Sequence, residues 1–372
     1  MSAHDPREDR RKQVGLACNE DVRRVYIDPA DIARLQAVAD FSYRAFSGVS
    51  DLLVAAARDP DAEAELAEFA ATLDALVVCH GAPLVSSDVL DQAPSLSLVG
   101  ELEGDRFGLR LDVSAAQRRG VRVVDTSNGS SWPTAEWALG LALVGLRNAG
   151  ALFRRIINHE PSFVLSNLRS GPGFDRAELR HKRIGMIGFG HVARCLVDLL
   201  RPFEVDVRAF DPFVSRELAE AYDVGFATLD SVLSADVVFV LVPHTPTTEG
   251  MLGAAELDLL RPGSVFVNVS RGKVVDTPAL IARLERGDVV ACLDVFDPEP
   301  MPLDSPVADM SNVFLSPHVA GVTEESRRRF FSLMVDDCLR HFAGIEPWFE
   351  LTPELVRLRT SPRSRGAQSS SP

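Results

Sequence analysis

The chain has 372 residues, of which 46% are hydrophobic and 25% charged, and its formal net charge is −14. This length exceeds one typical domain and suits two. Because phosphate backbones and anionic lipids repel an acidic chain, we expect no nucleic-acid partner and no membrane partner. The N-terminal segment lacks the apolar stretch of a secretory signal, and the five cysteines form neither a CxxC pair nor a disulfide framework. These features favour a cytoplasmic protein.

The N-terminal third of the sequence alternates short apolar runs with helical patterns. VRRVYI (residues 22–27) is predicted as the first strand, after a polar tail. Helices are predicted at 29–40 and 61–73, and further strands at 74–79, 95–100 and 120–125. Strands that alternate with helices indicate a parallel sheet.

The character of the sequence changes at TSNGSSWPTAEW (residues 126–137). Polar turn residues there lead into a helix over about 134–150 that is apolar nearly all round. Such a helix is either deeply buried or packed against a second subunit. From Arg183 onward strands and helices alternate cleanly, and a last amphipathic helix is predicted at 324–342. If that helix returns to the first domain, the first domain is discontinuous.

The stretch RIGMIGFGHVARCL (residues 183–196) has the context of a dinucleotide-binding fingerprint. A strand runs directly into Gly188 and Gly190 and then into a helix, and Asp211 ends the following strand. Gly188 would permit the tight turn, and Gly190 would let the backbone approach a pyrophosphate at the helix N-terminus. Asp211 would accept hydrogen bonds from ribose hydroxyls and repel a 2′-phosphate, which favours NAD over NADP. The alternative is a glycine-rich turn that binds no ligand.

Three further strands end in side chains that are suited to chemistry. Arg271 lies in a Ser-Arg-Gly turn after one strand, Glu299 in a proline-rich loop after a second, and His318 directly after a third. Open α/β sheets bind ligands at the carboxyl ends of their strands. Taken singly, each residue also has a plain structural interpretation: a solvated arginine, an exposed glutamate and a structural histidine.

The motifs RIGMIGFGHVA, VPHTPTTEGMLGAAELDLLRPGSVFVNVSRGKVVD, LDVFDPEP and SPHVAG together resemble those of the NAD-dependent D-isomer-specific 2-hydroxyacid dehydrogenases. The resemblance implies an enzyme that interconverts a 2-keto acid and a D-2-hydroxy acid, with Arg271, Glu299 and His318 as catalytic residues. Arg271 would grip the substrate carboxylate with its planar fork. His318 would exchange the hydroxyl proton while Glu299 orients its ring. The hydride would go to the nicotinamide.

The same resemblance implies the remaining binding residues. The cofactor NAD would contact Gly188, Gly190, His191, Val192, Asp211, Pro243, Thr248, Ser270, Asp294 and Gly321, with Asp294 holding the nicotinamide carboxamide. The substrate would contact His80, Gly81, Gly104 and Arg271. No metal site is expected, because no residues have zinc-ligand spacing. The apolar helix indicates a homodimer, as in the family.

These patterns and the resemblance predict an α/β fold with two Rossmann-like domains. One is a doubly wound NAD-binding domain, and the other is a discontinuous, flavodoxin-like substrate domain. The predicted substrate domain spans 22–126 and 326–358, and the predicted NAD-binding domain spans 127–325. Residues 1–21 and 359–372 are expected to be disordered tails.

The segment GELEGDRFGLRLD (residues 100–112) departs from the family pattern, which resembles RAGVGVDNID. It is slightly longer, and Glu101 stands where the family has arginine. Acidic residues here would disfavour a second anionic group on the substrate unless Arg106 compensates. Alternatively, Glu101, Glu103 and Asp105 simply point to water. The departure keeps a second hypothesis open, an NAD(H)-binding redox-sensing or corepressor-like module with little catalysis.

Overall fold

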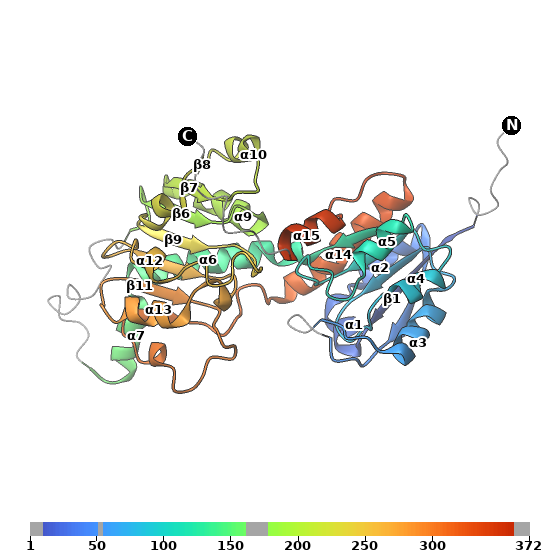
Figure 1. Ribbon diagram of the computed structural model, residues 1–372, viewed down its shortest axis with the longest axis horizontal. Coiled ribbons are helices and arrows are strands. Elements are labelled where there is room, and N and C mark those ends of the chain that lie inside the picture. Colours follow the sequence, from blue (N-terminus) through green and yellow to red (C-terminus); the bar gives the residue numbers. More distant parts are fainter. Residues whose placement is uncertain (1–9, 51–54, 161–177, 361–372) are drawn as a thin grey trace. The chain divides into compact units, whose positions relative to one another are not determined.

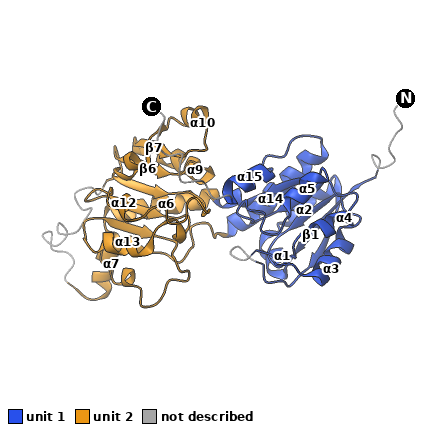
Figure 2. Ribbon diagram, in the orientation of Figure 1, with its two compact units in different colours: residues 1–130, 324–360 blue, residues 131–323, 361–372 orange. Residues whose placement is uncertain are grey.

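The structure is a computed structural model, and it describes residues 10–50, 55–160 and 178–360 (Figure 1). The chain divides into two compact units, shown in different colours in Figure 2. Unit 1 comprises residues 1–130 and 324–360, and unit 2 comprises residues 131–323 and 361–372. Within the described ranges, no helix combines the length and the apolar character that crossing a bilayer would require.

Unit 1 is built on a five-stranded parallel sheet with the order β2-β1-β3-β4-β5. The strands are β1 (Lys12–Cys18), β2 (Ala39–Ala45), β3 (Ala75–Val78), β4 (Leu98–Glu101) and β5 (Arg122–Asp125). This order is that of flavodoxin-like folds, in which the winding direction reverses between the strands that correspond to β1 and β3. The carboxyl ends of β1 and β3 therefore flank the place where such sheets bind ligands.

Helices cover both faces of the unit 1 sheet, and each face has its own hydrophobic core. One core is formed with α1 (Glu20–Tyr26), α2 (Pro29–Gln36) and α14 (Glu324–Phe342). The other core is formed with α3 (Pro60–Ala70), α4 (Ser87–Asp91) and α5 (Val113–Arg118), and α15 (Pro353–Thr360) packs against α5. Because α14 comes from the C-terminal part of the chain, unit 1 is discontinuous in sequence.

Two sequence-based predictions for unit 1 are wrong. Residues 22–27 lie largely in α1 and not in a strand, because the Asn19 side chain accepts the Val22 N–H at 2.8 Å and acidic residues fill the first turn. The expected tail at 1–21 also contains β1, which lies between β2 and β3 in the sheet. The buried part of β1 is short and follows a highly charged run, so its hydrophobic pattern did not stand out.

Unit 2 is built on a seven-stranded parallel sheet with the order β12-β11-β10-β9-β6-β7-β8. The strands are β6 (Arg183–Ile187), β7 (Asp206–Phe210), β8 (Gly225–Phe226), β9 (Val237–Val240), β10 (Val265–Asn268), β11 (Val290–Leu293) and β12 (Val313–Leu315). The winding direction reverses between β6 and β9, as in the Rossmann fold. The loops that follow β6, β7 and β9 therefore meet at the usual dinucleotide site of this fold.

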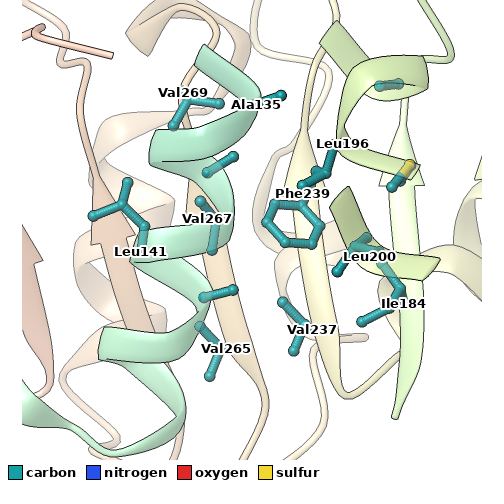
Figure 3. Close-up of a cluster of buried hydrophobic side chains, with 14 of the residues drawn as sticks. Ala135, Leu141, Ile184, Leu196, Leu200, Val237, Phe239, Val265, Val267 and Val269 are labelled. Carbon is teal, nitrogen blue, oxygen red and sulfur yellow. The ribbon is translucent and has the colours of Figure 1, made fainter. Parts of the chain in front are cut away.

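Two hydrophobic cores also sandwich the unit 2 sheet, which is why its strands are continuously apolar. One core is formed with α6 (Ser131–Leu146) and α9 (His191–Leu200), and Figure 3 shows Phe239 and Val267 of the strands beside Leu141 of α6 and Leu196 of α9. The opposite core is formed with α11 (Leu229–Leu233), α12 (Ala254–Leu257) and α13 (Thr277–Leu284).

The remaining elements of the described chain are short. Helix α7 (Ala149–Ile157) follows α6 and lies near β12, and α10 (Arg216–Ala221) lies beside β8. Single 3₁₀ turns are η1 (Ser127–Ser130), η3 (Arg201–Phe203), η4 (Gly272–Val274) and η5 (Pro306–Ala308). The turn η4 directly follows the Ser270–Arg271 turn at the end of β10.

Candidate active site

The glycine-rich loop joins β6 to α9 where the winding of unit 2 reverses. Gly188 has a φ of +95°, a backbone conformation that favours glycine, and a Cβ there would lie 2.8 Å from Val242 Cγ1. A Cβ on Gly190 would meet no described atom within 4 Å, so the loop is open on that side. Gly190 caps α9 without a side-chain hydrogen bond. An N-terminus of this kind, with its positive dipole end, fits a cofactor pyrophosphate.

Asp211 lies directly after β7 and ties this strand to the glycine-rich loop. Its Oδ2 accepts a hydrogen bond from the Phe189 N–H at 2.8 Å, and its Oδ1 accepts one from the Phe213 N–H at 2.9 Å. Each carboxylate oxygen has a second lone pair, so Asp211 retains acceptor capacity for ribose hydroxyls. Of the other predicted cofactor residues here, His191 and Val192 form the first turn of α9.

The loop after β9 carries Pro243 and Thr248, next to the glycine-rich loop in sheet order. Thr248 Oγ donates to the Pro243 carbonyl oxygen at 2.6 Å, and the Thr245 N–H donates to Thr248 Oγ at 2.8 Å. These hydrogen bonds close the loop on itself. Gly321, the last predicted cofactor residue, lies in the loop that follows β12.

The turn after β10 presents Arg271, and Asn268 builds that turn. Asn268 Oδ1 accepts from both the N–H and the hydroxyl of Ser270 at 3.0 Å, and Asn268 Nδ2 donates to the Arg271 carbonyl oxygen at 3.1 Å. A Cβ on Gly272 would overlap the Phe296 carbonyl oxygen. Glycine at 272 therefore lets the turn after β10 lie against the loop after β11. Sequence reasoning missed Asn268, which ends the predicted strand in the motif VNVSRGK.

His318 and Glu299 form a direct pair at the ends of β12 and β11. His318 Nδ1 lies 2.5 Å from Glu299 Oε1, and the two side chains are 21% and 25% exposed. Because an ionised carboxylate only accepts hydrogen bonds, Nδ1 carries the proton and Nε2 is the basic nitrogen of the neutral ring. His318 has a φ of +52°, an uncommon conformation for a non-glycine residue that often marks functional sites.

Asp294, at the end of β11, holds the loop that carries His318. Its buried carboxylate accepts hydrogen bonds from Ser316 Oγ at 2.5 Å, the Val319 N–H at 3.1 Å and the Ala320 N–H at 3.0 Å. The His318 N–H donates to the Asp294 carbonyl oxygen at 2.8 Å. Within the chain Asp294 therefore holds the loop that carries His318, and its contact with the nicotinamide carboxamide stays a prediction.

The predicted substrate glycines of unit 1 have packing roles in the structure. Gly81 has a φ of +87°, its N–H donates to the Ser50 carbonyl oxygen at 2.9 Å, and its own carbonyl oxygen accepts the Gly48 N–H at 2.9 Å. A Cβ on Gly104 would overlap Glu101 Oε2. Both positions therefore require glycine for close approach. The third predicted residue, His80, follows β3 and makes side-chain contacts with other polar residues of unit 1.

The acidic segment after β4 does not simply point to water. Glu101 is fully buried, and its Oε1 accepts from Arg110 Nη1 at 2.9 Å and from the Arg110 N–H at 3.0 Å. Burial, with the nearby Asp125 charge, raises the pKa of Glu101 to about 7. Arg110 compensates the acidic charge, whereas the Arg106 guanidinium donates to backbone carbonyl oxygens. No sequence signal linked Glu101 to Arg110.

Comparison with known proteins places unit 2 in a family. Residues 146–320 match the model of the D-isomer specific 2-hydroxyacid dehydrogenase, NAD binding domain. The D-3-phosphoglycerate dehydrogenase of Archaeoglobus fulgidus is 32% identical over 274 residues, which cover 72% of this chain and 50% of that protein. The glyoxylate reductase of Aeropyrum pernix is 28% identical over 287 residues, which cover 74% of this chain and 82% of that protein.

The fold is shared with a solved structure. The crystal structure of a phosphoglycerate oxidoreductase from Rhizobium etli matches with a TM-score of 0.75 at 24% identity, over 91% of this chain and 98% of that one. This likeness, with the two sheets, confirms the predicted α/β class with two Rossmann-like domains.

Fold and site together define a dinucleotide-binding protein of the Rossmann class. Through unit 2 the chain belongs to the D-isomer specific 2-hydroxyacid dehydrogenase family, as its motifs predict. The matching model is that of an NAD binding domain, which confirms NAD as the predicted cofactor. The chain spans about half the length of the curated D-3-phosphoglycerate dehydrogenases it matches.

Proposed function

We propose that this protein is an NAD-dependent oxidoreductase that interconverts a 2-keto acid and a D-2-hydroxy acid. The observation that carries the proposal is the 2.5 Å hydrogen bond between His318 Nδ1 and Glu299 Oε1. A histidine oriented by a carboxylate is suited to moving a hydroxyl proton. The turn that bears Arg271 lies against the loop after β11, which leads to Glu299. The names of the relatives, D-3-phosphoglycerate dehydrogenase and glyoxylate reductase, support the same reaction class.

The cofactor residues fit NAD. Gly188, Gly190 and the N-terminus of α9 would hold the pyrophosphate, and Asp211 would accept hydrogen bonds from the adenosine ribose and disfavour the 2′-phosphate of NADP. When bound, NAD supplies the hydride chemistry at C2 of the substrate.

The proton and the carboxylate are handled by residues of the chain. His318 Nε2 takes the substrate hydroxyl proton during oxidation and returns it during reduction, because Nδ1 is committed to Glu299. The Glu299 carboxylate stabilises the imidazolium that forms. Arg271 binds the substrate carboxylate through two parallel hydrogen bonds and so fixes the orientation of C2.

The test is NADH consumption at 340 nm against a panel of 2-keto acids, from glyoxylate and hydroxypyruvate to branched and aromatic acids, with NADPH alongside. We expect turnover with at least one acid and a preference for NADH. NADH binding without turnover on any acid would contradict the enzymatic function and favour the NAD(H)-binding module.

We also propose that the protein is a homodimer. On α7 the side chains of Phe153, Ile156 and Ile157 are 61%, 49% and 55% exposed, and their spacing forms one apolar stripe. A second copy of the chain would cover this stripe. Light scattering should give about twice 40.5 kDa, and Phe153→Asp should shift the mass toward the monomer. The control Leu303→Asp, at another exposed apolar residue, should stay dimeric. A monomeric wild type at micromolar concentration would contradict the proposal.

We place the protein in the cytoplasm as part of the same proposal. All five cysteines are free thiols, which suits a reducing compartment. Cell fractionation with a tagged full-length chain tests this location.

A further inference from the structure

Trp137 of α6 reaches the loop that carries His318 through two buried polar side chains. Its Nε1–H donates to Ser316 Oγ at 3.0 Å, and Ser316 Oγ donates to Asp294 Oδ1 at 2.5 Å. Ser316 and Asp294 are buried, and the half-buried Trp137 packs against the hydrophobic core beneath α6. All three residues, like His318, belong to unit 2. We call Trp137, Ser316 and Asp294 the Trp–Ser–Asp network.

The chemistry of the Trp–Ser–Asp network leaves one direction for each hydrogen bond. An indole N–H only donates, so the Ser316 oxygen accepts from Trp137. An ionised carboxylate only accepts, so the Ser316 hydroxyl proton points to Asp294. In a chain of hydrogen bonds each bond polarises the next. Trp137 therefore orients and strengthens the contact between Ser316 and Asp294.

Asp294 carries the network to the backbone at and after His318. The Val319 N–H donates to Asp294 Oδ1 at 3.1 Å, and the Ala320 N–H donates to Asp294 Oδ2 at 3.0 Å. The His318 N–H donates to the Asp294 carbonyl oxygen at 2.8 Å. Three successive backbone N–H groups are thus bonded to one residue, whose carboxylate is itself fixed by Ser316.

His318 needs this restraint because its backbone conformation is an uncommon one. Its φ of +52° lies in the left-handed region, which a non-glycine residue keeps only where surrounding contacts over-determine it. In this conformation its Nδ1 reaches Glu299 Oε1. A return to an ordinary backbone conformation would turn the ring away from the carboxylate. The hydrogen bonds to Asp294 therefore set the direction of the His318 ring.

Packing alone does not account for Trp137. Phenylalanine would supply apolar surface at a core position without a polar atom that needs a partner. Trp137 instead brings an N–H, and the partner of that N–H is the hydroxyl that bonds Asp294. Because Trp137 and Ser316 lie 179 positions apart in the sequence, no local pattern of residues links the indole to His318.

We propose that Trp137 and Ser316 are positioning residues for His318. Their hydrogen bonds fix the Asp294 carboxylate, which holds the His318 backbone in the conformation that pairs its ring with Glu299. The inference rests on the proposed function, in which His318 exchanges the substrate hydroxyl proton. It extends the candidate machinery to α6, a helix that carries none of the candidate catalytic residues.

The first test is hydrogen exchange in the full-length protein, followed by mass spectrometry on peptides that cover residues 316–322. Trp137→Phe keeps an aromatic ring but removes the N–H. It should speed the exchange of the Val319 and Ala320 amides about 3- to 10-fold, the effect of losing a neutral hydrogen bond. Trp132→Phe, at an exposed position on the same helix, is the matched control and should leave these peptides unchanged. Peptides from β6 should exchange as in the wild type in both variants, which reports that they are folded.

The second test is steady-state kinetics on the best acid of the panel. In Trp137→Phe we expect kcat to fall about 3- to 10-fold. The KM for the acid and the affinity for NADH should stay close to the wild-type values, because separate hydrogen bonds hold the Arg271 turn and the glycine-rich loop. Trp132→Phe should keep the wild-type kcat. A residue that only supports folding would instead lower the amount of protein that binds NADH.

A double variant separates positioning from general support of the fold. His318→Ala removes the group that the network positions, so adding Trp137→Phe to it should change turnover by less than about 2-fold. A general loss of structure would instead lower the turnover of His318→Ala by about the same factor as it lowers that of the wild type.

Ser316 offers the same test from the other side of the hydrogen bond. Ser316→Ala removes the hydroxyl that bonds the charged Asp294 and should lower kcat about 10- to 100-fold. Ser316→Thr keeps a hydroxyl and should recover most of the wild-type turnover. These two variants decide the proposal if Trp137→Phe does not fold.

Unchanged exchange of the Val319 and Ala320 amides in Trp137→Phe would overturn the proposal, and so would a full further loss of turnover on the His318→Ala background. The exchange experiment needs no turnover. If the wild type reduces none of the acids, the proposed function fails, while the exchange rates still decide whether Trp137 holds the His318 loop.

Discussion

The two units share one architecture, a parallel sheet with helices on both faces, yet they place their functional side chains differently. In unit 2 the candidate catalytic residues lie in the turns and loops that follow β10, β11 and β12. In unit 1 hydrogen bonds join Tyr26 of α1, His80 of the loop after β3, and Glu103 and Arg110 of the segment after β4. The candidate catalytic residues of unit 2 are thus recognisable in local motifs, whereas the hydrogen-bonded group of unit 1 is assembled only by the fold.

The two units also differ in how deeply they bury a pair of charged side chains. The Glu299–His318 pair of unit 2 stays partly exposed, as a group that exchanges a proton must. The Glu101–Arg110 pair of unit 1 is fully buried, and Glu101 Oε2 has no hydrogen-bond partner among the described residues. Burying an ion pair costs desolvation energy that the pairing offsets only in part. Unit 1 therefore bears a desolvation cost at the buried Glu101–Arg110 pair.

The largest expected effect is the loss of turnover when the candidate proton-transfer residue of unit 2 is removed. His318→Ala should lower turnover roughly 10²- to 10⁴-fold, because the group that moves the proton is lost. NADH binding, measured by fluorescence titration, should survive. His181→Ala, which removes an exposed histidine of the same unit, is the control and should retain wild-type turnover. Wild-type turnover in His318→Ala would remove it from the mechanism.

A smaller loss is expected from the carboxylate clamp of unit 2. Arg271→Lys keeps the positive charge but cannot form two parallel hydrogen bonds. We expect kcat/KM to fall roughly 10- to 100-fold, the value of a hydrogen bond to a charged group. Steady-state kinetics on the best acid of the panel measures it. Wild-type kinetics would show that Arg271 does not grip the substrate.

The cofactor half of unit 2 should respond more weakly. Asp211→Ala removes the proposed ribose acceptor, the hydrogen bond from the Phe189 N–H of the glycine-rich loop and the one from the Phe213 N–H. We expect NADH affinity to fall about 10-fold and the preference over NADPH to narrow. Asp206→Ala, at the exposed first residue of β7, is the control. If the preference for NADH is unaffected, Asp211 does not read the ribose.

The smallest expected effect is a pH dependence of stability that comes from Glu101 in unit 1. The pKa of Glu101 is raised from 4.5 to about 7, first by burial and then by Asp125, so the folded state holds this proton more tightly than the unfolded state. The stabilisation of the folded state by this proton is fully present below the unfolded-state pKa of 4.5. It is lost as the pH rises through about 7. Once this stabilisation is lost in full, the free energy of unfolding is lower by roughly 3 kcal/mol.

Glu101→Gln cannot titrate and isolates this contribution. Between pH 5 and pH 8 the wild-type melting temperature should fall by several degrees relative to that of Glu101→Gln. Thermal melts at stepped pH measure the difference, and the exposed Glu68→Gln should show no such trend against the wild type. Parallel melting curves of the wild type and Glu101→Gln across this range would show that Glu101 does not titrate there.

The errors of sequence reasoning fall mainly in unit 1. Residues 22–27 look like a strand because VRRVYI is rich in β-branched residues, but the Asn19 cap makes them helical. Strand β1 was missed because its buried part is short and follows charged residues. The acidic residues after β4 were open to a solvated interpretation because nothing in the sequence pairs Glu101 with Arg110.

The sequence by itself determined the two-domain α/β class, the dinucleotide fingerprint at Gly188–Gly190 with Asp211, and the candidate set of Arg271, Glu299 and His318. It did so because each of these features needs only a strand, a turn and a residue directly after it, and parallel strands bring such turns to one edge of the sheet. Only the tertiary structure decided how Asp294 and Asn268 hold the turns that carry these residues, and that Glu101 pairs with Arg110. Some of these contacts join segments far apart in the chain, and others are hydrogen bonds across a turn. No local pattern of residue types specifies either kind.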